Sequence, residues 1–235
     1  MNKILVNNND SLIKVPDGAE VFILDKSTNP LKIEIGINCK VDYLAILNNS
    51  CEREIIIGDN SMVNINGLYL SSGQFKINNH LGREVVLNSQ ILSYQKNDQL
   101  LQIEDNYIFA DKSSVGKIIV NALVDNQATT NYLSDIIIKR EAIETETRID
   151  MKLYLLSRQA RGLMLPGLKI ATNAVKAGHG ASTNKLTPED LFYLKSRGLS
   201  EEQAKKIVID SIVKNFLITI KDDEYKKMVS SLVIL

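Results

Sequence analysis

The chain from Lys3 to about Ser182 alternates between short apolar runs and clusters of turn-forming residues. The runs are rich in Ile, Val, Leu and Tyr, as in KILV, EVFIL, LKIEI, KVDYLAIL, REIII, GKIIVNALV and YLSDIIIK. Segments such as NNND, PDG, LNNS and VDN separate them, and these residue types tolerate a positive φ or hydrogen-bond to their own backbone. Several runs alternate, so that Ile33 and Ile35 share one face of a strand. Runs spaced about 8–12 residues apart predict many short β-strands.

Two architectures fit this pattern. One is a β-sandwich or barrel of paired strands, and the other is a solenoid of stacked coils. Tight hairpins would favour the sandwich, but only Asn66-Gly67 and Asp17-Gly18 offer the usual two-residue turns. Dispersed asparagines suit the stacked turns of a β-helix. The sequence has no exact repeat, so periodicity alone leaves both architectures open.

The end of the chain changes from the period of strands to that of helices. Thr187 is a good N-cap for a first helix, and Ser200 with Gln203 has the spacing of a capping box for a second. One face of the second helix is expected to carry Ala204, Ile207, Val208, Ser211, Ile212 and Asn215. We therefore predict a β-rich core over residues 1–184 and a C-terminal helical region over residues 185–235.

Composition excludes several classes of partner. The 235 residues include 28 basic and 28 acidic side chains, and this balance argues against nucleic acid as the main partner. The sequence has neither a signal peptide nor the ~20 apolar residues of a membrane span, so we expect a cytoplasmic protein with no membrane partner. Cys39 and Cys51 do not form a CxxC pair, so they are expected to be free thiols rather than zinc ligands.

Common catalytic motifs are absent from the sequence. It has no phosphate-binding loop, no GxSxG elbow and no HExxH helix, and the acidic cluster around Glu144 and Glu146 is interpreted as a solvated strand face. His179 stands between Gly178 and Gly180, which would permit a tight bend or the close approach of a backbone or ligand. Imidazole binds iron, but one histidine does not hold a metal, so a structural role and a ligand role both stay open.

The segment from Ala160 to Val208 resembles the C-terminal signature of the SufB/SufD family, scaffold components of the SUF iron–sulfur cluster assembly system. It reads ARGLMLPGLKIATNAVKAGHGASTNKLTPEDLFYLKSRGLSEEQAKKIV, and the match rests on PGLKI, HGAS and LFYLKSRGLS in the family's order. SufB-like members carry His-Glu at the HGAS turn and a cysteine upstream of it. This chain has His179-Gly180, the SufD-like form, and no cysteine after Cys51.

The resemblance implies a fold, partners and a site. The family's fold is mainly β, a right-handed parallel β-helix with a small C-terminal α-helical region. Members pair through their β-helices and bind the ABC ATPase SufC through the C-terminal helices. His179 would then lie at the pairing surface and share iron or a transient iron–sulfur cluster with a partner chain, and this chain alone would bind none. The residues expected to dock the ATPase are Leu191, Phe192, Tyr193, Leu194, Arg197 and Gly198.

Three functions are compared on this basis. The leading interpretation is a non-enzymatic, SufD-like scaffold or accessory component that pairs with a SufB-like paralogue. The first alternative is a minimal scaffold that pairs with a second copy of itself, so that two copies of His179 meet. The second alternative is a β-helix enzyme acting on polysaccharide, which is disfavoured because the chain has no Trp and no secretion signal.

Overall fold

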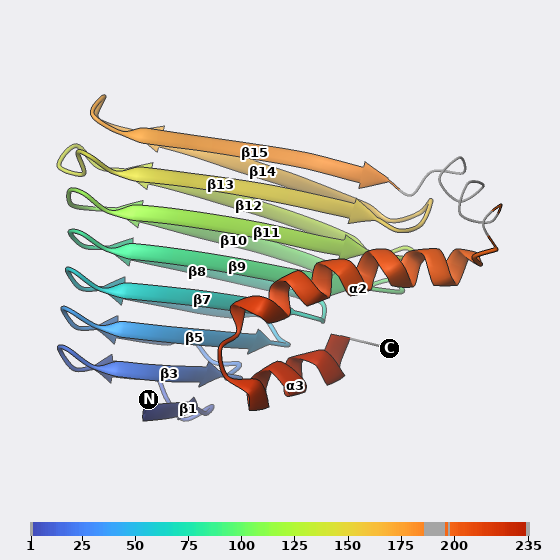
Figure 1. Ribbon diagram of the computed structural model, residues 1–235, viewed down its shortest axis with the longest axis horizontal. Helices are drawn as coiled ribbons and strands as arrows, with labels where there is room; N and C mark the ends of the chain where they lie inside the picture. Colours follow the sequence, from blue (N-terminus) through green and yellow to red (C-terminus); the bar gives the residue numbers. More distant parts are fainter. Residues whose placement is uncertain (1, 186–195, 197, 234–235) are drawn as a thin grey trace.

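A computed structural model describes residues 2–185, residue 196 and residues 198–233 of the chain. Residues 2–185 contain fifteen β-strands, and helices α2 and α3 lie within the described residues 198–233 (Figure 1). The strands are β1 Asn2–Val6, β2 Leu12–Val15, β3 Glu20–Asp25, β4 Leu31–Ile35, β5 Lys40–Leu47, β6 Cys51–Ile57, β7 Met62–Tyr69, β8 Gly73–Leu81, β9 Val86–Gln95, β10 Leu100–Phe109, β11 Val115–Val124, β12 Thr129–Ile138, β13 Glu146–Leu155, β14 Arg161–Ile170 and β15 Lys176–Lys185. The helices are α2 Glu201–Thr219 and α3 Asp223–Val233.

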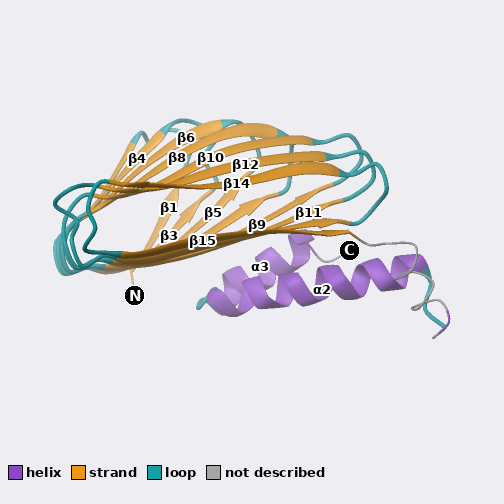
Figure 2. Cartoon of the chain, turned by 90° about the horizontal axis from the view of Figure 1, so that it is seen from above, coloured by secondary structure: helices purple, strands orange, loops and turns teal. Residues whose placement is uncertain are grey.

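The strands form two parallel sheets, and successive strands alternate between them. The odd-numbered strands make an eight-stranded sheet and the even-numbered strands make a seven-stranded sheet, each in chain order. Each strand therefore pairs with the strand one coil further along, and the two sheets enclose one interior (Figures 1 and 2). This confirms the expected parallel β-helix with C-terminal helices and excludes the sandwich, whose neighbouring strands would be joined by hairpins.

The coils lengthen along the solenoid. Ile4 pairs with Ile23, 19 positions later, whereas Ile149 pairs with His179, 30 positions later. Strand length rises in parallel, from five residues in β1 to ten in β15. Because no two distant coils share a length, the sequence shows no exact repeat even though the architecture is repetitive.

One corner of every coil is a stacked turn. In successive coils the turn residue has a φ between 55° and 69°, and its N–H donates to a carbonyl of the next coil at 2.6–3.0 Å. The residues at this position are Gly18, Asn38, Asn60, Glu84, Ser113 and Glu144. Asparagine and glycine adopt this left-handed conformation most readily, which confirms the interpretation of the dispersed asparagines as stacked turns.

The interior is apolar but encloses a charged cluster. The Arg53 Nε donates to Asp25 Oδ2 at 2.7 Å, and both side chains are almost fully buried. The remaining Arg53 donors reach the carbonyls of Ser27 at 2.6 Å and Asn29 at 2.7 Å, while the Tyr43 hydroxyl donates to Asp25 Oδ2 at 2.6 Å. A buried guanidinium is tolerated here because its donors have acceptors contributed by neighbouring turns.

The two cysteines are free thiols, as expected. Both Cys39 and Cys51 are buried within the first coils. The Cys39 Sγ lies 3.2 Å from the carbonyl oxygen of Pro16, which makes it a weak donor inside the stacked corner. Burial raises the pKa of the Cys51 thiol to about 11, so this thiol stays protonated at neutral pH.

Helices α2 and α3 cover part of the outer face of the eight-stranded sheet (Figure 2). The Phe22 ring stacks on that of Tyr225, with centroids 4.7 Å apart and planes 13° from parallel. The outward strand residues that the helices bury are Phe22, Leu24, Leu44, Ile46, Leu68, Leu92 and Leu123. This burial on both faces explains why EVFIL and KVDYLAIL are continuous apolar runs rather than alternating ones.

The start of α2 is capped as the sequence predicts, but its buried face is rotated from the expected one. The Ser200 Oγ accepts from the Gln203 N–H at 3.2 Å, and the Ser200 N–H donates to Gln203 Oε1 at 2.7 Å. The expected face included Ile207, Ser211 and Asn215, which are exposed. The side chains that contact the sheet are those of Ala204, Ile212, Val213 and Phe216. The expected face includes the polar residues Ser211 and Asn215, whereas the sheet buries the more apolar side of the helix.

Helices α2 and α3 share a hydrophobic core with the strands. The division of the chain into a β-rich core and a helical region between residues 184 and 185 stays a prediction. Among the described residues, no helix has the length and apolar character needed to cross a bilayer.

Candidate functional site

The candidate site lies on the last coil of the solenoid. Among the described strands, β15 pairs only with β13, and β14 pairs only with β12. The far edge of each terminal strand therefore presents N–H and C=O groups that no described strand satisfies. Both edges are ten residues long, which is long enough to pair with another chain.

His179 lies near the middle of β15 and continues an interior column. It is in register with Ile149, which is fully buried. In the preceding coils the same column carries Ile4, Ile23, Tyr43, Ile65, Ser89 and Ile118. Side chains at paired positions of a parallel sheet point to the same side, so the imidazole is on the interior side of β15. No described coil covers it, and it is exposed.

The surroundings of His179 on the same coil are apolar and small. Ala177 and Ala181 are the neighbouring interior positions of β15, and Met164 and Leu168 are half-buried on β14. This end of the interior is thus an apolar surface with a single imidazole in it.

The outer face of β15 is different in character. Gly178 and Gly180 are in register with Arg148 and Asp150 of β13. The Arg148 guanidinium donates twice to the Asp150 carboxylate, from Nε to Oδ2 at 2.8 Å and from Nη2 to Oδ1 at 2.7 Å. We call this exposed pair the Arg148–Asp150 fork. It lies on β13, beside the two glycines of β15 that flank His179.

The described residues do not form a metal-binding cluster around His179. No group of three or more His, Cys, Asp or Glu side chains able to hold a metal ion occurs among the described residues. Cys39 and Cys51 lie at β5 and β6, and β5 is five strand spacings from β15, or roughly 24 Å. Clusters are normally held by several thiolates, so the donor set around His179 does not fit a cluster held by this chain alone.

Most of the predicted docking residues lie outside the described part of the chain. These are Leu191, Phe192, Tyr193, Leu194 and Arg197. Gly198 is described and has a φ of +84°, a conformation that favours glycine in the turn before α2. The docking role of all six residues stays a prediction.

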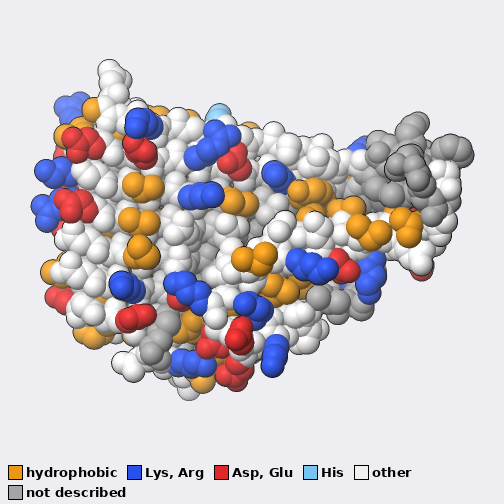
Figure 3. Space-filling view, in the orientation of Figure 1, with side chains coloured by type: hydrophobic (Ala, Val, Ile, Leu, Met, Phe, Trp, Pro, Cys, Tyr) orange, Lys and Arg blue, Asp and Glu red, His pale blue; other side chains and the backbone are white. Residues whose placement is uncertain are grey.

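Sequence reasoning missed the apolar character of the exposed side of α2. Ile207 is 54% exposed and Ile218 is 76% exposed, on the side of the helix that turns away from the sheet. In Figure 3 apolar side chains follow this helix, interspersed with charges of both signs. The signal in the sequence is the presence of Ile207 and Ile218 outside the apolar side of the helix that Ala204, Ile212, Val213 and Phe216 form.

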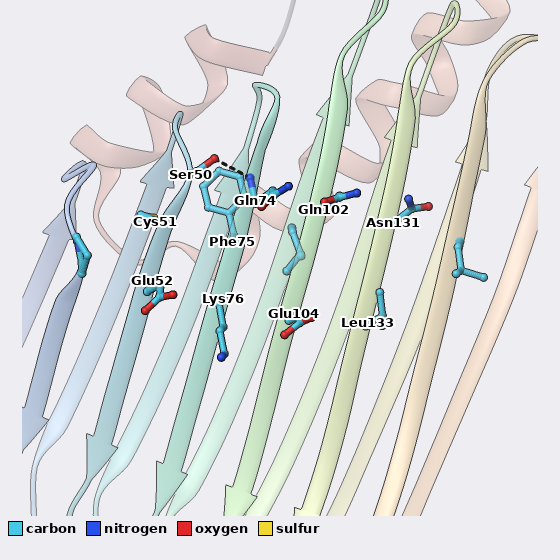
Figure 4. Close-up of a pocket in the computed structure, with 13 residues that line it drawn as sticks. Ser50, Cys51, Glu52, Gln74, Phe75, Lys76, Gln102, Glu104, Asn131 and Leu133 are labelled. Carbon is cyan, nitrogen blue, oxygen red and sulfur yellow. Dashed lines mark hydrogen bonds between the residues drawn. The ribbon is translucent and has the colours of Figure 1, made fainter.

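A second feature is a hollow of about 700 Å³ on the outer face of the seven-stranded sheet (Figure 4). Side chains from β6, β8, β10 and β12 line it in two columns that run across the strands. The first column is Ser50, Gln74, Gln102 and Asn131, and the second is Glu52, Lys76, Glu104 and Leu133. The hollow is wide, is lined by both polar and apolar side chains and lies on the opposite sheet from His179, and Leu163 of β14 extends it to the outer face of the terminal coil.

Comparison with known proteins identifies the family. The family model described as SUF system FeS cluster assembly, SufBD core domain, matches residues 9–212. An iron–sulfur cluster assembly SufBD family protein of Pyrococcus horikoshii is 29% identical over 184 residues, which cover 77% of this chain and 35% of that protein. The iron–sulfur cluster assembly protein SufD of Bacillus subtilis is 30% identical over 114 residues, 48% of this chain and 26% of that protein.

A SufBD family protein of Mycobacterium leprae is 37% identical over 83 residues, 35% of this chain and 21% of its own length. The chain thus covers about a third or less of the length of these relatives. The family match itself extends over most of the solenoid and into α2, well beyond the signature that the sequence motifs identified. With its parallel β-solenoid and C-terminal helices, the chain belongs to the SufBD family of iron–sulfur cluster assembly proteins.

Proposed function

We propose that this protein is a non-enzymatic, SufD-like scaffold or accessory component of a cytoplasmic SUF iron–sulfur cluster assembly complex. It pairs with another chain through the last coil of the solenoid and docks a SufC-like ABC ATPase through residues 187–220. The observation that carries the proposal is His179 at the uncovered end of the interior column, on an open strand edge of ten residues. Nucleotide hydrolysis belongs to the ATPase, because this sequence has no phosphate-binding loop.

The two ends of the solenoid differ in a way that supports pairing at the terminal coil. At the first coil, β1 and β2 have only five and four residues, and short edge strands are poor templates for another strand. At the last coil, two ten-residue edges flank an apolar interior surface that includes Met164 and Leu168. Joining this end to a second solenoid would pair the edges and cover the apolar surface in one step.

Pairing is tested with one substitution at each end. Leu168 and Ile13 are both half-buried, interior-facing residues of an end coil. Leu168→Lys is expected to abolish pairing, measured by native mass spectrometry of the 26.3 kDa chain, because it places a charge on the apolar surface. Ile13→Lys is the matched control and is expected to leave pairing intact. A reversed result would place the interface at the first coil.

The same measurement distinguishes the two partners. A SufB-like paralogue would supply the cysteine that this chain lacks near His179, whereas a second copy would bring two copies of His179 together. Co-expression with a cysteine-bearing paralogue is expected to give mixed pairs in preference to pairs of identical chains. Exclusive self-pairing would favour the minimal scaffold.

In the assembled complex, His179 is expected to contribute one ligand to iron or to the nascent cluster, with sulfur from the partner. His179→Ala should lower the iron and sulfide content after anaerobic reconstitution, followed by visible absorption and chemical assay. His80→Ala, at the other histidine of the chain, is the control. If the His179→Ala complex pairs normally and carries the same cluster content as wild type, the ligand role is wrong.

ATPase docking through residues 187–220 is supported by two exposed isoleucines of α2 within that range, Ile207 and Ile218. Phe192→Asp and Tyr193→Asp are each expected to abolish co-purification with the ATPase while the circular dichroism spectrum is retained. Leu232→Asp, at an exposed apolar position of α3, is the control and should not affect binding. Unchanged binding in both test variants would remove the first predicted helix from the interface.

A further inference from the structure

The Gly-His-Gly sequence has an explanation within the chain itself. A Cβ added at Gly180 would lie 2.8 Å from Asp150 Oδ1 and 3.3 Å from Arg148 Nη2. A Cβ added at Gly178 would lie 3.1 Å from Arg148 Nη1. The space that these glycines leave on the outer face of β15 is therefore already filled by the Arg148–Asp150 fork, so a partner chain is not required to account for the glycines.

A carboxylate over the glycine of the next coil is a recurrent device of this solenoid. At two corners the Oδ1 of an aspartate would lie 2.3–2.4 Å from a Cβ on the glycine below, and it accepts the N–H of the following residue at 2.9 Å. The pairs are Asp17 over Gly36 and Asp59 over Gly82. In both cases the aspartate thus binds the backbone of the next coil at the corner.

On both strands of the terminal coil a carboxylate also lies over a glycine, here paired with a cation instead of with a backbone N–H. Asp150 lies over Gly180 of β15, and Asp135 lies over Gly167 of β14, where an added Cβ would be 2.0 Å from Oδ1. Each of these carboxylates forms an ion pair. Asp150 pairs with Arg148, and Asp135 Oδ2 lies 2.6 Å from Lys169 Nζ. The last strands have no following coil among the described residues, so the preceding coil contacts them from one side only.

We propose that Arg148 and Asp150 are positioning residues for His179. The fork lies over the backbone on either side of His179. It thereby fixes the path of β15 and the direction of the imidazole at the pairing surface. This inference rests on the proposed function, because the positioned group matters only if His179 acts there. The exposed ion pair itself contributes little to stability, so its effect should be on geometry rather than on folding.

The test is a double-mutant cycle between Gly180 and Asp150, read by NMR of the histidine rings in the full chain. The chain has two histidines, so His80 on β8 is an internal reference, and the His80→Gln variant assigns the two signals. Gly180→Ala is expected to move the His179 ring resonances while those of His80 stay in place. With Asp150→Ala as the background, Gly180→Ala should cause little further shift of the His179 resonances, because the oxygen that met the new Cβ is gone.

Two further variants keep the result decisive. Asp150→Ala alone adds no atom and should shift the His179 resonances even if Gly180→Ala fails to fold, so an unmoved His179 signal in this variant would overturn the proposal. Asp135→Ala removes the equivalent carboxylate from the other strand and should leave His179 unmoved.

The competing explanation of the glycines makes the opposite prediction. If Gly180 were required for the approach of a partner, Gly180→Ala would weaken pairing equally with and without Asp150, and that outcome would also overturn the proposal. The ring resonances test the positioning, whereas the cluster content of His179→Ala tests the function, so the two ideas can fail separately.

Discussion

Asp105 provides a quantitative test of the solenoid interior. Its carboxylate on β10 is only 2% exposed, and Oδ2 accepts from the hydroxyls of Tyr107 at 2.7 Å and Tyr132 at 2.8 Å. Oδ1 accepts from Asn79 Nδ2 at 2.9 Å. Burial raises the pKa of Asp105 to about 6, and the three donors only partly offset that rise.

The shift from 3.8 to about 6 corresponds to ~3 kcal/mol of stability. Because the pKa is higher in the folded state, the contribution is fully present below about pH 4, where both states are protonated. This contribution decreases as the pH rises toward 6, because the unfolded chain releases its proton first. Above that pH the free energy of unfolding no longer changes through Asp105. Asp105→Asn cannot titrate, so wild type should lose roughly 2 kcal/mol relative to this variant between pH 4 and pH 7.

The assay is urea unfolding followed by circular dichroism at several pH values from 4 to 7. The quantity compared is the wild-type free energy of unfolding minus that of Asp105→Asn, so contributions from all other titrating groups cancel. Asp111→Asn, at an exposed corner position, controls for the loss of one formal charge. A difference that is flat over this range, or one that moves in favour of wild type as the pH rises, would refute the argument.

Three other predictions concern stability. Arg53→Met should cost about 3–5 kcal/mol in urea unfolding because it leaves the buried Asp25 carboxylate unpaired, and Asp25→Asn in the same chain should recover much of that loss. Phe216→Ala should cost ~3–5 kcal/mol and speed hydrogen exchange in α2 and α3, because this ring is 4% exposed between helix and sheet; unchanged exchange there would contradict the packing. Ser200→Ala should cost about 1 kcal/mol and expose the first-turn amides of α2 to exchange, and protected amides would show that the cap is dispensable.

Several features were accessible from the sequence because they depend on neighbours along the chain. The apolar runs and turn residues identify the strands, and the capping box identifies the start of α2, since each signal lies within a few residues of the element it defines. The signature from Ala160 to Val208 indicates the family and contains His179. The choice between sandwich and solenoid needed that resemblance, because coils that lengthen from 19 to 30 positions leave no repeat to detect.

Other features depend on which residues meet across coils, and only the tertiary structure decided them. Asp25 and Arg53, or Asp105 and Tyr132, are 27 or 28 positions apart and come together only when the register between coils is fixed. A slip of one residue would turn each strand over, so local sequence does not reveal that His179 ends an interior column while Arg148 and Asp150 lie over the neighbouring glycines. The buried side of α2 was likewise set by the outer face of the sheet rather than by the helix sequence. The strands are encoded locally, whereas the site is produced by stacking, because stacking determines which side chains face inward and where the interior is left open.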